Sequence, residues 1–163
     1  MKMRREKESD VDQITEIHNQ AFNGLDEGKI VKNLRENKNL TISLVCEIDG
    51  IVVGHIAYSP IKNKNGEIIG IGLAPIGVLP SFQNQGIGSR LVEYGNKQAF
   101  ELGFKEIFVL GDTQYYSRFG FVLAKNYNYY CEYDPEGDHF MMQGELSKVL
   151  EKTVVYYCKE FNV

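Results

Sequence analysis

The chain carries the run Gln83-Asn84-Gln85-Gly86-Ile87-Gly88 between an apolar segment, 68–79, and a segment of helical spacing, 89–102. Backbone N–H groups at a helix start have no partner within the helix, and the helix dipole adds partial positive charge there. The two glycines remove the Cβ atoms that would hold a phosphate away from those N–H groups. The run therefore predicts an anion cradle for a phosphorylated cofactor, with a simple tight turn as the alternative.

Two common phosphate-binding motifs are absent around this run. A P-loop needs a glycine, four residues and then Gly-Lys-Ser/Thr, and the chain has no such sequence. A dinucleotide-binding loop needs a third glycine, whereas this chain continues Ser89-Arg90-Leu91. The cradle therefore favours neither nucleoside triphosphates nor dinucleotides.

Turn signals divide the segment before the cradle into strands. Alternating apolar residues over 41–48 end at Asp49-Gly50, the sequence of a tight hairpin turn. Strands 51–61 and 67–79 follow, and together the three predict an antiparallel meander that leads into the cradle helix. Two helices precede them. One covers 11–22, starts from a capping-box pattern of Ser9 and Asp12, and has Phe22 close behind its apolar positions, and the other covers 27–37.

The second half of the chain also alternates between helical and strand patterns. The cradle helix has an apolar stripe that we expect to face the sheet, and it ends at Gly103, the expected left-handed cap. The residues of that stripe are Ile87, Leu91, Gly95, Ala99 and Leu102. A strand over 104–110, a helical turn over 115–118 and later strands over 120–123, 139–146 and 153–158 complete a mixed α+β class.

Composition sets limits on the class of protein. With 163 residues, the chain is most simply one domain, 1–163, with a substantial core. The net charge is −4 without a basic cluster, so we expect no nucleic-acid partner. The apolar runs fall short of the ~18 residues of a membrane helix, and 1–10 is unlike a secretory signal. We therefore expect a cytoplasmic protein without a membrane partner.

Cysteine and histidine are scattered along the chain. The three cysteines fit reduced thiols better than a disulfide framework. The three histidines share no short metal-ligand spacing, so we expect no metal site.

Two motifs in order carry a resemblance to a known family. Gln83-x-x-Gly86-x-Gly88 resembles the Gln/Arg-x-x-Gly-x-Gly/Ala signature of the GNAT superfamily of acyl-CoA N-acyltransferases. Further on, Tyr115-Tyr116-Ser117-Arg118-Phe119-Gly120-Phe121 resembles the later Tyr-x-x-x-Gly-Phe motif, most closely that of bacterial predicted N-acetyltransferases. The order of predicted elements agrees from Arg4 to about Phe121. The resemblance implies a GNAT-like fold: a twisted, mostly antiparallel central sheet with one splayed strand pair and flanking helices.

The resemblance implies acetyl-CoA as the acetyl donor. The N–H groups from Gln85 to Ser89 would hold its pyrophosphate, and the strand end would pair with the amides of its pantetheine arm. The cofactor-binding residues predicted in this way are Ile76, Gly77, Val78, Gln83, Asn84, Gln85, Gly86, Ile87, Gly88 and Ser89. Pro75 marks either a bulge that opens a slot for the arm or an ordinary sheet edge.

Tyr116 is the predicted catalytic residue. It lies four residues before Gly120, where the family places a general acid. A phenol stays protonated at neutral pH and is therefore available to protonate the departing CoA thiolate. The alternative is a tyrosine of the core, since the chain has ten tyrosines.

The proton acceptor for the amine stays open. The candidates are Glu47, His55 and Glu67, acting directly or through water. Asp112 stands where many family members carry an asparagine that contacts the pantetheine, which leaves that contact in doubt.

Acceptor recognition is expected from two segments, 26–35 and 127–138. Four tyrosines of the second segment form either an aromatic wall or a packed strand, and they are Tyr127, Tyr129, Tyr130 and Tyr133.

The sequence therefore predicts an N-acetyltransferase that moves acetyl from acetyl-CoA to a primary amine by direct attack in a ternary complex. The acceptor is a small molecule or a peptide, and a homodimer is an open option. The alternative function is a non-catalytic CoA or acyl-CoA sensor, or an accessory module of the same fold.

Overall fold

The computed structural model describes residues 1–163. Its strands and helices form two compact units. Unit 1 contains residues 1–59, 74–98 and 159–163, and unit 2 contains residues 60–73 and 99–158. Two long strands, β3 (Ile51–Lys62) and β4 (Ile68–Val78), contribute residues to both units. The assignment of 1–163 to one domain stays a prediction.

Unit 1 is built on the strand order β1-β2-β3-β4. Strand β1 (Lys2–Arg5) pairs antiparallel with β2 (Ile42–Ile48), which pairs antiparallel with β3. The hairpin between β2 and β3 turns at Asp49 and Gly50, both with positive φ, as the Asp-Gly sequence predicts. The predicted meander is therefore confirmed, with β1 added at its edge.

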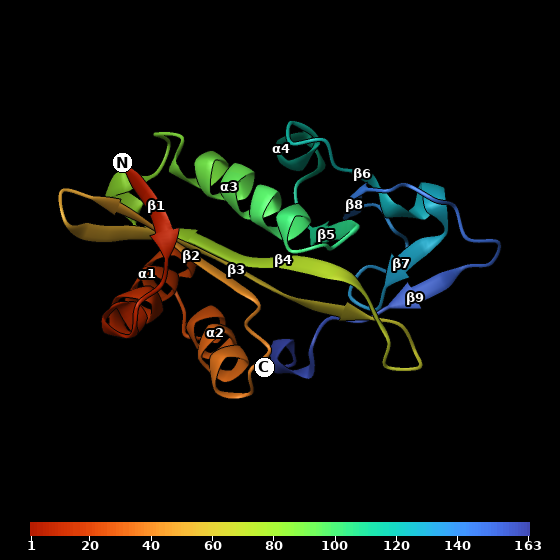
Figure 1. Ribbon diagram of the computed structural model, residues 1–163, viewed down its shortest axis with the longest axis horizontal. Coiled ribbons are helices and arrows are strands. Elements are labelled where there is room, and N and C mark those ends of the chain that lie inside the picture. Colours follow the sequence, from red (N-terminus) through yellow and green to blue (C-terminus); the bar gives the residue numbers. More distant parts are fainter. The chain divides into compact units, whose positions relative to one another are not determined.

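Helices cover both faces of these strands (Figure 1). Helices α1 (Val11–Phe22) and α2 (Asp26–Glu36) lie on one face, and α3 (Ile87–Glu101) lies on the other. Short 3-10 turns occur at Glu8–Asp10, Pro80–Phe82 and Lys159–Phe161. A buried apolar cluster joins α1 and α2 to the strands, and it consists of Ile14, Ile17, Val31, Val45, Val52 and Ala57.

Helix α3 lies unusually close to β3. A Cβ built on Gly95 would overlap the ring and hydroxyl of Tyr58, which is completely buried. The Tyr58 hydroxyl donates to Asn96 Oδ1 at 2.7 Å, so the same turn of α3 satisfies this buried polar group. Gly95 therefore has a packing role, which explains a glycine in a helix interior.

Unit 2 has the strand order β3-β4-β5-β8-β6. Strand β5 (Glu106–Leu110) pairs parallel with β4 over Ile71–Leu73, and it pairs antiparallel with β8 (Phe140–Gly144). The ladder between β4 and β5 ends at Leu73, although β4 continues to Val78. The mixed α and β class with a mostly antiparallel sheet is confirmed.

The remaining elements of unit 2 are short. Helix α4 (Thr113–Ser117) precedes β6 (Val122–Leu123) and a 3-10 turn at Ala124–Tyr127. Strands β7 (Tyr129–Cys131) and β9 (Thr153–Val155) form a separate parallel pair. Of the two alternatives for the late tyrosines, the packed strand is therefore the one found for Tyr129 and Tyr130.

The N-terminal segment differs from its prediction. Residues 2–5 form β1, a strand that their charged composition did not predict. The strand is possible because its charge is paired: Arg4 forms ion pairs with both Asp10 and Glu47. The predicted box of Ser9 and Asp12 is wrong as well, since Asp10 takes the capping role and accepts from the Lys7 N–H at 2.6 Å.

The hydrophobic patterns fail at two helix ends. Leu102 is half exposed because α3 ends at Glu101, one residue before it could face the sheet. Phe22 ends α1 and is also exposed. The later strands are shorter than predicted and are limited to the residues that find ladder partners.

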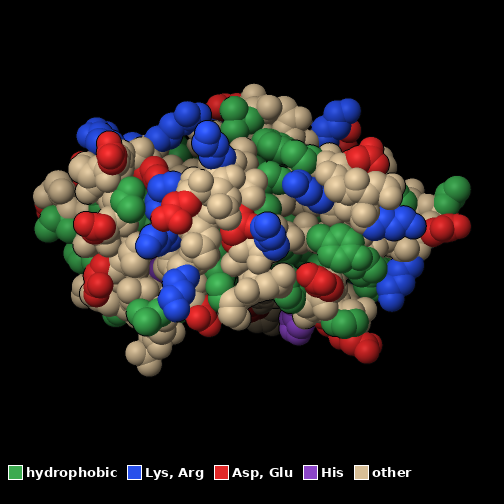
Figure 2. All heavy atoms as spheres, turned by 90° about the horizontal axis from the view of Figure 1, so that it is seen from below, with side chains coloured by type: hydrophobic (Ala, Val, Ile, Leu, Met, Phe, Trp, Pro, Cys, Tyr) green, Lys and Arg blue, Asp and Glu red, His purple; other side chains and the backbone are tan.

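The surface shows no segregation of charge on the face drawn in Figure 2, where acidic and basic side chains are interspersed. None of the helices is both long enough and apolar enough to span a bilayer.

We expect Gly95→Ala to destabilise the protein by about 1–3 kcal/mol, because overpacking a core costs that much and outweighs the better helix propensity of alanine. Urea unfolding measures the change. Gly24→Ala is the matched control, since a Cβ there meets nothing closer than 3.9 Å. Equal stability of Gly95→Ala and wild type would show that the contact with Tyr58 is loose.

Candidate functional site

The loop between β4 and α3 is held by its own side chains. Gln83 Nε2 donates to the carbonyl oxygen of Val78 at 2.9 Å, and Gln85 Nε2 donates to that of Ser81 at 3.4 Å. Asn84 and Gly86 both have positive φ, which reverses the chain immediately before α3. These two glutamines therefore shape the loop with their side chains. The Gln83 N–H also donates within the loop, to the Pro80 carbonyl oxygen at 3.4 Å.

Backbone donors at this helix start are unpaired within the chain. None of the backbone hydrogen bonds of the turns, loops and caps is donated by Gln85, Gly86, Ile87 or Gly88. The first intrahelical bond begins later, where Arg90 N donates to the Gly86 carbonyl oxygen at 3.1 Å. A row of free N–H groups at the positive end of a 15-residue helix is the arrangement that holds a phosphate.

The ten predicted cofactor-binding residues lie on three consecutive pieces of unit 1. Three are the last residues of β4, and four are in the loop that follows it. The other three, Ile87, Gly88 and Ser89, form the first turn of α3. Ile87 is buried and anchors the helix start. The assignment of these residues to a cofactor stays a prediction.

A pair of buried histidines lies against β4. His18 on α1 and His55 on β3 are both fully buried, and His18 Nε2 is 2.8 Å from His55 Nδ1. His18 also faces Gly77, because a Cβ built there would lie 2.8 Å from His18 Nδ1. Burial lowers the pKa of His18 to about 4 and holds the pKa of His55 well below its usual value, so both are neutral near pH 7.

His55 is one of the three bases that the sequence suggests, but its contact with His18 is not predicted from the sequence. No local signal links them, because they lie 37 residues apart on different elements. The other two base candidates are occupied elsewhere. Glu47 accepts from Arg4, and Glu67 accepts from Asn63 at the exposed turn between β3 and β4.

Tyr116 lies on α4 in unit 2. Its ring packs against Gly111, where a Cβ would lie 2.6 Å from Tyr116 Cε2, and it meets Phe121 edge-on at 5.9 Å between ring centroids. Burial raises the pKa of Tyr116 to about 12, with smaller contributions from Tyr115 and Asp112. The phenol is therefore a proton donor at neutral pH, and its catalytic role stays a prediction.

Asp112 caps α4. Its carboxylate accepts from the N–H groups of Gln114 at 2.9 Å and Tyr115 at 3.3 Å. Helix capping thus accounts for an aspartate at a position where many family members carry an asparagine.

The side chains form no metal-ligand cluster and no disulfide. The chain has no cluster of three or more His, Cys, Asp or Glu side chains that could hold a metal ion. The three cysteines are free and buried.

Known proteins are similar to this chain over most of its length. The family model described as "Acetyltransferase (GNAT) family" matches residues 11–121. An uncharacterized N-acetyltransferase of Escherichia coli K12, YhbS, is 32% identical over 165 residues, which cover 99% of each chain. A second E. coli K12 protein, the uncharacterized N-acetyltransferase YjhQ, is 33% identical over 117 residues, 69% of this chain and 65% of its own.

Two solved structures are also similar to this one. The crystal structure of E. coli YhbS in complex with CoA has a TM-score of 0.89 at 30% identity and covers 99% of this chain and 92% of its own. A GNAT family acetyltransferase of Brucella melitensis in complex with acetyl-CoA has a TM-score of 0.83 at 34% identity, with 98% and 97% covered.

We expect stability to fall as the pH is lowered from about 7 toward 4. An unfolded histidine binds a proton near pH 6.5, whereas folded His18 resists protonation until about pH 4, so the unfolded state holds more protons in this window. The contribution of His18 alone is on the order of 3 kcal/mol. Urea unfolding at several pH values measures it.

His18→Gln should flatten this slope, and His139→Gln, which removes an exposed histidine, should leave it unchanged. A wild-type stability that stays constant between pH 7 and 4.5 would contradict neutral burial of the pair.

Proposed function

This chain belongs to the acetyltransferase (GNAT) family, and from that premise we propose that it transfers an acetyl group from acetyl-CoA to the primary amine of a small molecule or peptide. The observation that carries the proposal is the row of unpaired N–H groups from Gln85 to Gly88 at the start of α3. The two similar proteins crystallised with CoA and with acetyl-CoA support the same choice of donor.

The loop and strand supply complementary binding groups. The N–H groups at the start of α3 would hold the pyrophosphate, whose charge the helix dipole favours. The backbone at Ile76, Gly77 and Val78 would pair with the pantetheine amides in the manner of an added strand, because the ladder between β4 and β5 ends before these residues. Bound acetyl-CoA would supply the reactive thioester.

Tyr116 would protonate the departing sulfur. Its hydroxyl is held in the acid form by burial, so it would be available to give its proton to the sulfur as the carbon–sulfur bond breaks. The amine attacks directly in a ternary complex, since all three cysteines are buried and lie outside both motifs.

A screen of acetyl-CoA consumption over polyamines, aminoglycosides, amino acids and peptides with free N-termini tests the proposal, with mass spectrometry of the products. Acetylated product on at least one amine is the expected result. Tight binding of CoA in calorimetry without product from any amine would favour the sensor, and the absence of binding at millimolar CoA would overturn the proposal.

We expect Tyr116→Phe to lower kcat by about 10²-fold or more while the Kd for CoA stays unchanged, because general acid catalysis contributes that much and the ring remains in place. Steady-state rates and calorimetry separate the two effects. Tyr94→Phe, which removes the hydroxyl of an exposed tyrosine on α3, is the control. Full activity of Tyr116→Phe across the pH range would refute the assignment.

Gly86→Ala should weaken CoA binding. Gly86 has a φ of 83°, which costs alanine about 1–2 kcal/mol and shifts the N–H groups of the loop. Gly66→Ala introduces the same strain at a φ of 80° in the turn between β3 and β4 and should leave CoA affinity unchanged. Calorimetry with CoA measures both variants, and equal affinities would mean that the loop does not hold the cofactor.

A further inference from the structure

One nitrogen of the buried histidine pair has no partner. His18 Nδ1 makes no hydrogen bond within the chain, although the side chain is completely inaccessible to solvent. Nδ1 faces β4 at Gly77, and only the missing Cβ of that glycine leaves space between them. An unsatisfied buried acceptor is costly, so we expect a water or a ligand as the partner of Nδ1.

The other nitrogen starts an uninterrupted chain of hydrogen bonds. His18 Nε2 contacts His55 Nδ1 at 2.8 Å, and His55 Nε2 contacts Ser43 Oγ at 2.8 Å. Ser43 in turn donates its hydroxyl hydrogen to Glu6 Oε1. Hydrogen bonds thus link four residues one after another: three lie on α1, β3 and β2, and the fourth follows β1 directly.

The Glu6 carboxylate can only accept, so it fixes the donor and the acceptor of every hydrogen bond in this series. Because the Ser43 hydrogen points to Glu6, the Ser43 oxygen must accept from His55 Nε2–H. His55 Nδ1 is then the acceptor for His18 Nε2–H. The hydrogen-bond network therefore assigns both rings as Nε2–H tautomers. The one lone pair of this hydrogen-bonded series that has no donor is on His18 Nδ1.

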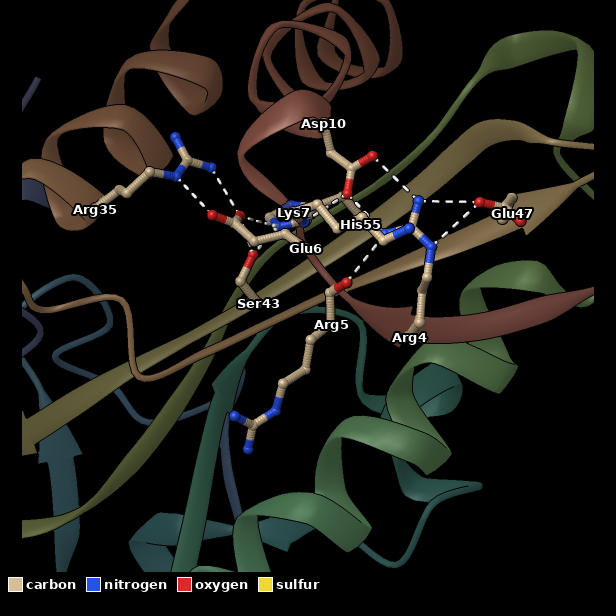
Figure 3. A network of polar contacts seen from close by, with 9 residues as sticks. All are labelled: Arg4, Arg5, Glu6, Lys7, Asp10, Arg35, Ser43, Glu47 and His55. Carbon is tan, nitrogen blue, oxygen red and sulfur yellow. Dashed lines mark hydrogen bonds and ion pairs between the residues drawn. The ribbon is translucent and has the colours of Figure 1, made fainter.

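The hydrogen-bonded series ends at Glu6, which is in contact with solvent. Glu6 and Arg35 form a two-point ion pair with distances of 2.8 Å, and both side chains are partly exposed (Figure 3). A cavity of about 210 Å³ adjoins this pair. It is lined by Arg5, Glu6, Arg35, Leu40, Thr41, Ile42, Ser43 and Gln98.

From this geometry we propose that His18, His55, Ser43 and Glu6 form a proton relay that carries the proton of the amine acceptor from Gly77 on β4 to the cavity beside Arg35. The relay rests on the proposed function, because it supplies the route for the proton that acetyl transfer releases. It gives a role to a histidine that the sequence pattern did not identify, and it needs no solvent-exposed base.

Each transfer conserves protons. The protonated amine loses one proton, through water, to His18 Nδ1, while His18 gives its Nε2 proton to His55 Nδ1. His55 gives its Nε2 proton to Ser43, whose own hydrogen passes to Glu6 and then to water in the cavity. Rotation of the rings and hydroxyl restores the original tautomers before the next turnover.

The electrostatics favour a relay over a stored charge. The charged groups facing the rings are Arg35 on α2 and Glu6 beyond β1, and the Glu6 carboxylate is 4.0 Å from His55 Nε2. Burial together with the Arg35 charge lowers the pKa of both histidines, so an imidazolium is disfavoured. Concerted transfer would keep both rings neutral, as their lowered pKa values require.

Solution NMR of the full chain labelled with ¹⁵N-histidine tests the relay without any acceptor. At pH 7, His18 and His55 should both appear as neutral Nε2–H tautomers. Ser43→Ala should slow the exchange of the ring N–H protons with water by about tenfold or more, because it removes the hydroxyl that passes them on. Ser59→Ala is the matched control, since Ser59 is a buried serine of the adjacent strand whose hydroxyl has no partner.

The sign of the exchange effect separates a relay from a structural role. A hydroxyl that only supports packing would, when removed, loosen the site and speed exchange. Unchanged or faster exchange in Ser43→Ala, or a proton on His18 Nδ1 in the free protein, would overturn the relay.

Kinetics provide a second test with the best amine of the screen. Ser43→Ala should lower kcat about 10²-fold near pH 7, leave the KM for acetyl-CoA unchanged and approach wild type at a pH where the amine is already neutral. An equal loss at every pH would contradict the relay. If wild type acetylates no amine, the proposed function fails, and the exchange experiment alone decides the relay.

Discussion

The close seating of α3 on β3 is the constraint on which the candidate site depends. Tyr58 fills the space that a side chain at position 95 would take, and its hydroxyl bonds to Asn96 on the same turn. At the start of the helix, buried Ile87 holds the first turn. With the helix fixed at its start and in its middle, the free N–H groups before it point in a constant direction, which a preorganised anion site requires.

Partly buried ion pairs hold β1 against its neighbours. Arg4 joins Asp10 to Glu47, and Glu6 joins Arg35 to Ser43, so β1 and the following turn are fastened to β2 and α2 by two ion-pair networks (Figure 3). The guanidinium of Arg4 lowers the pKa of Asp10, which keeps that carboxylate charged. The second network leads inward to the histidine pair, so the groups that fasten β1 also give a buried histidine access to the surface.

The two faces meet at β4, whose last residues serve both. Gly77 lies against His18 on the face covered by α1, and Val78 accepts the hydrogen bond that shapes the loop before α3. A single short segment therefore connects the proposed binding of the acetyl donor to the proposed exit of the proton. Tyr116 would complete the chemistry from α4, where burial keeps its phenol protonated.

Local patterns were sufficient for much of this molecule. The Asp49-Gly50 turn, the amphipathic helices and the glycine loop before α3 were predicted within a residue or two, since neighbouring residues determine each of them. The family followed from two short motifs in the right order. Strand β1 escaped prediction because its charges are neutralised by residues distant in sequence. For the same reason, only the tertiary structure could bring His18, His55, Ser43 and Glu6 together: they come from four elements, and a hydrogen-bonded chain has no sequence period.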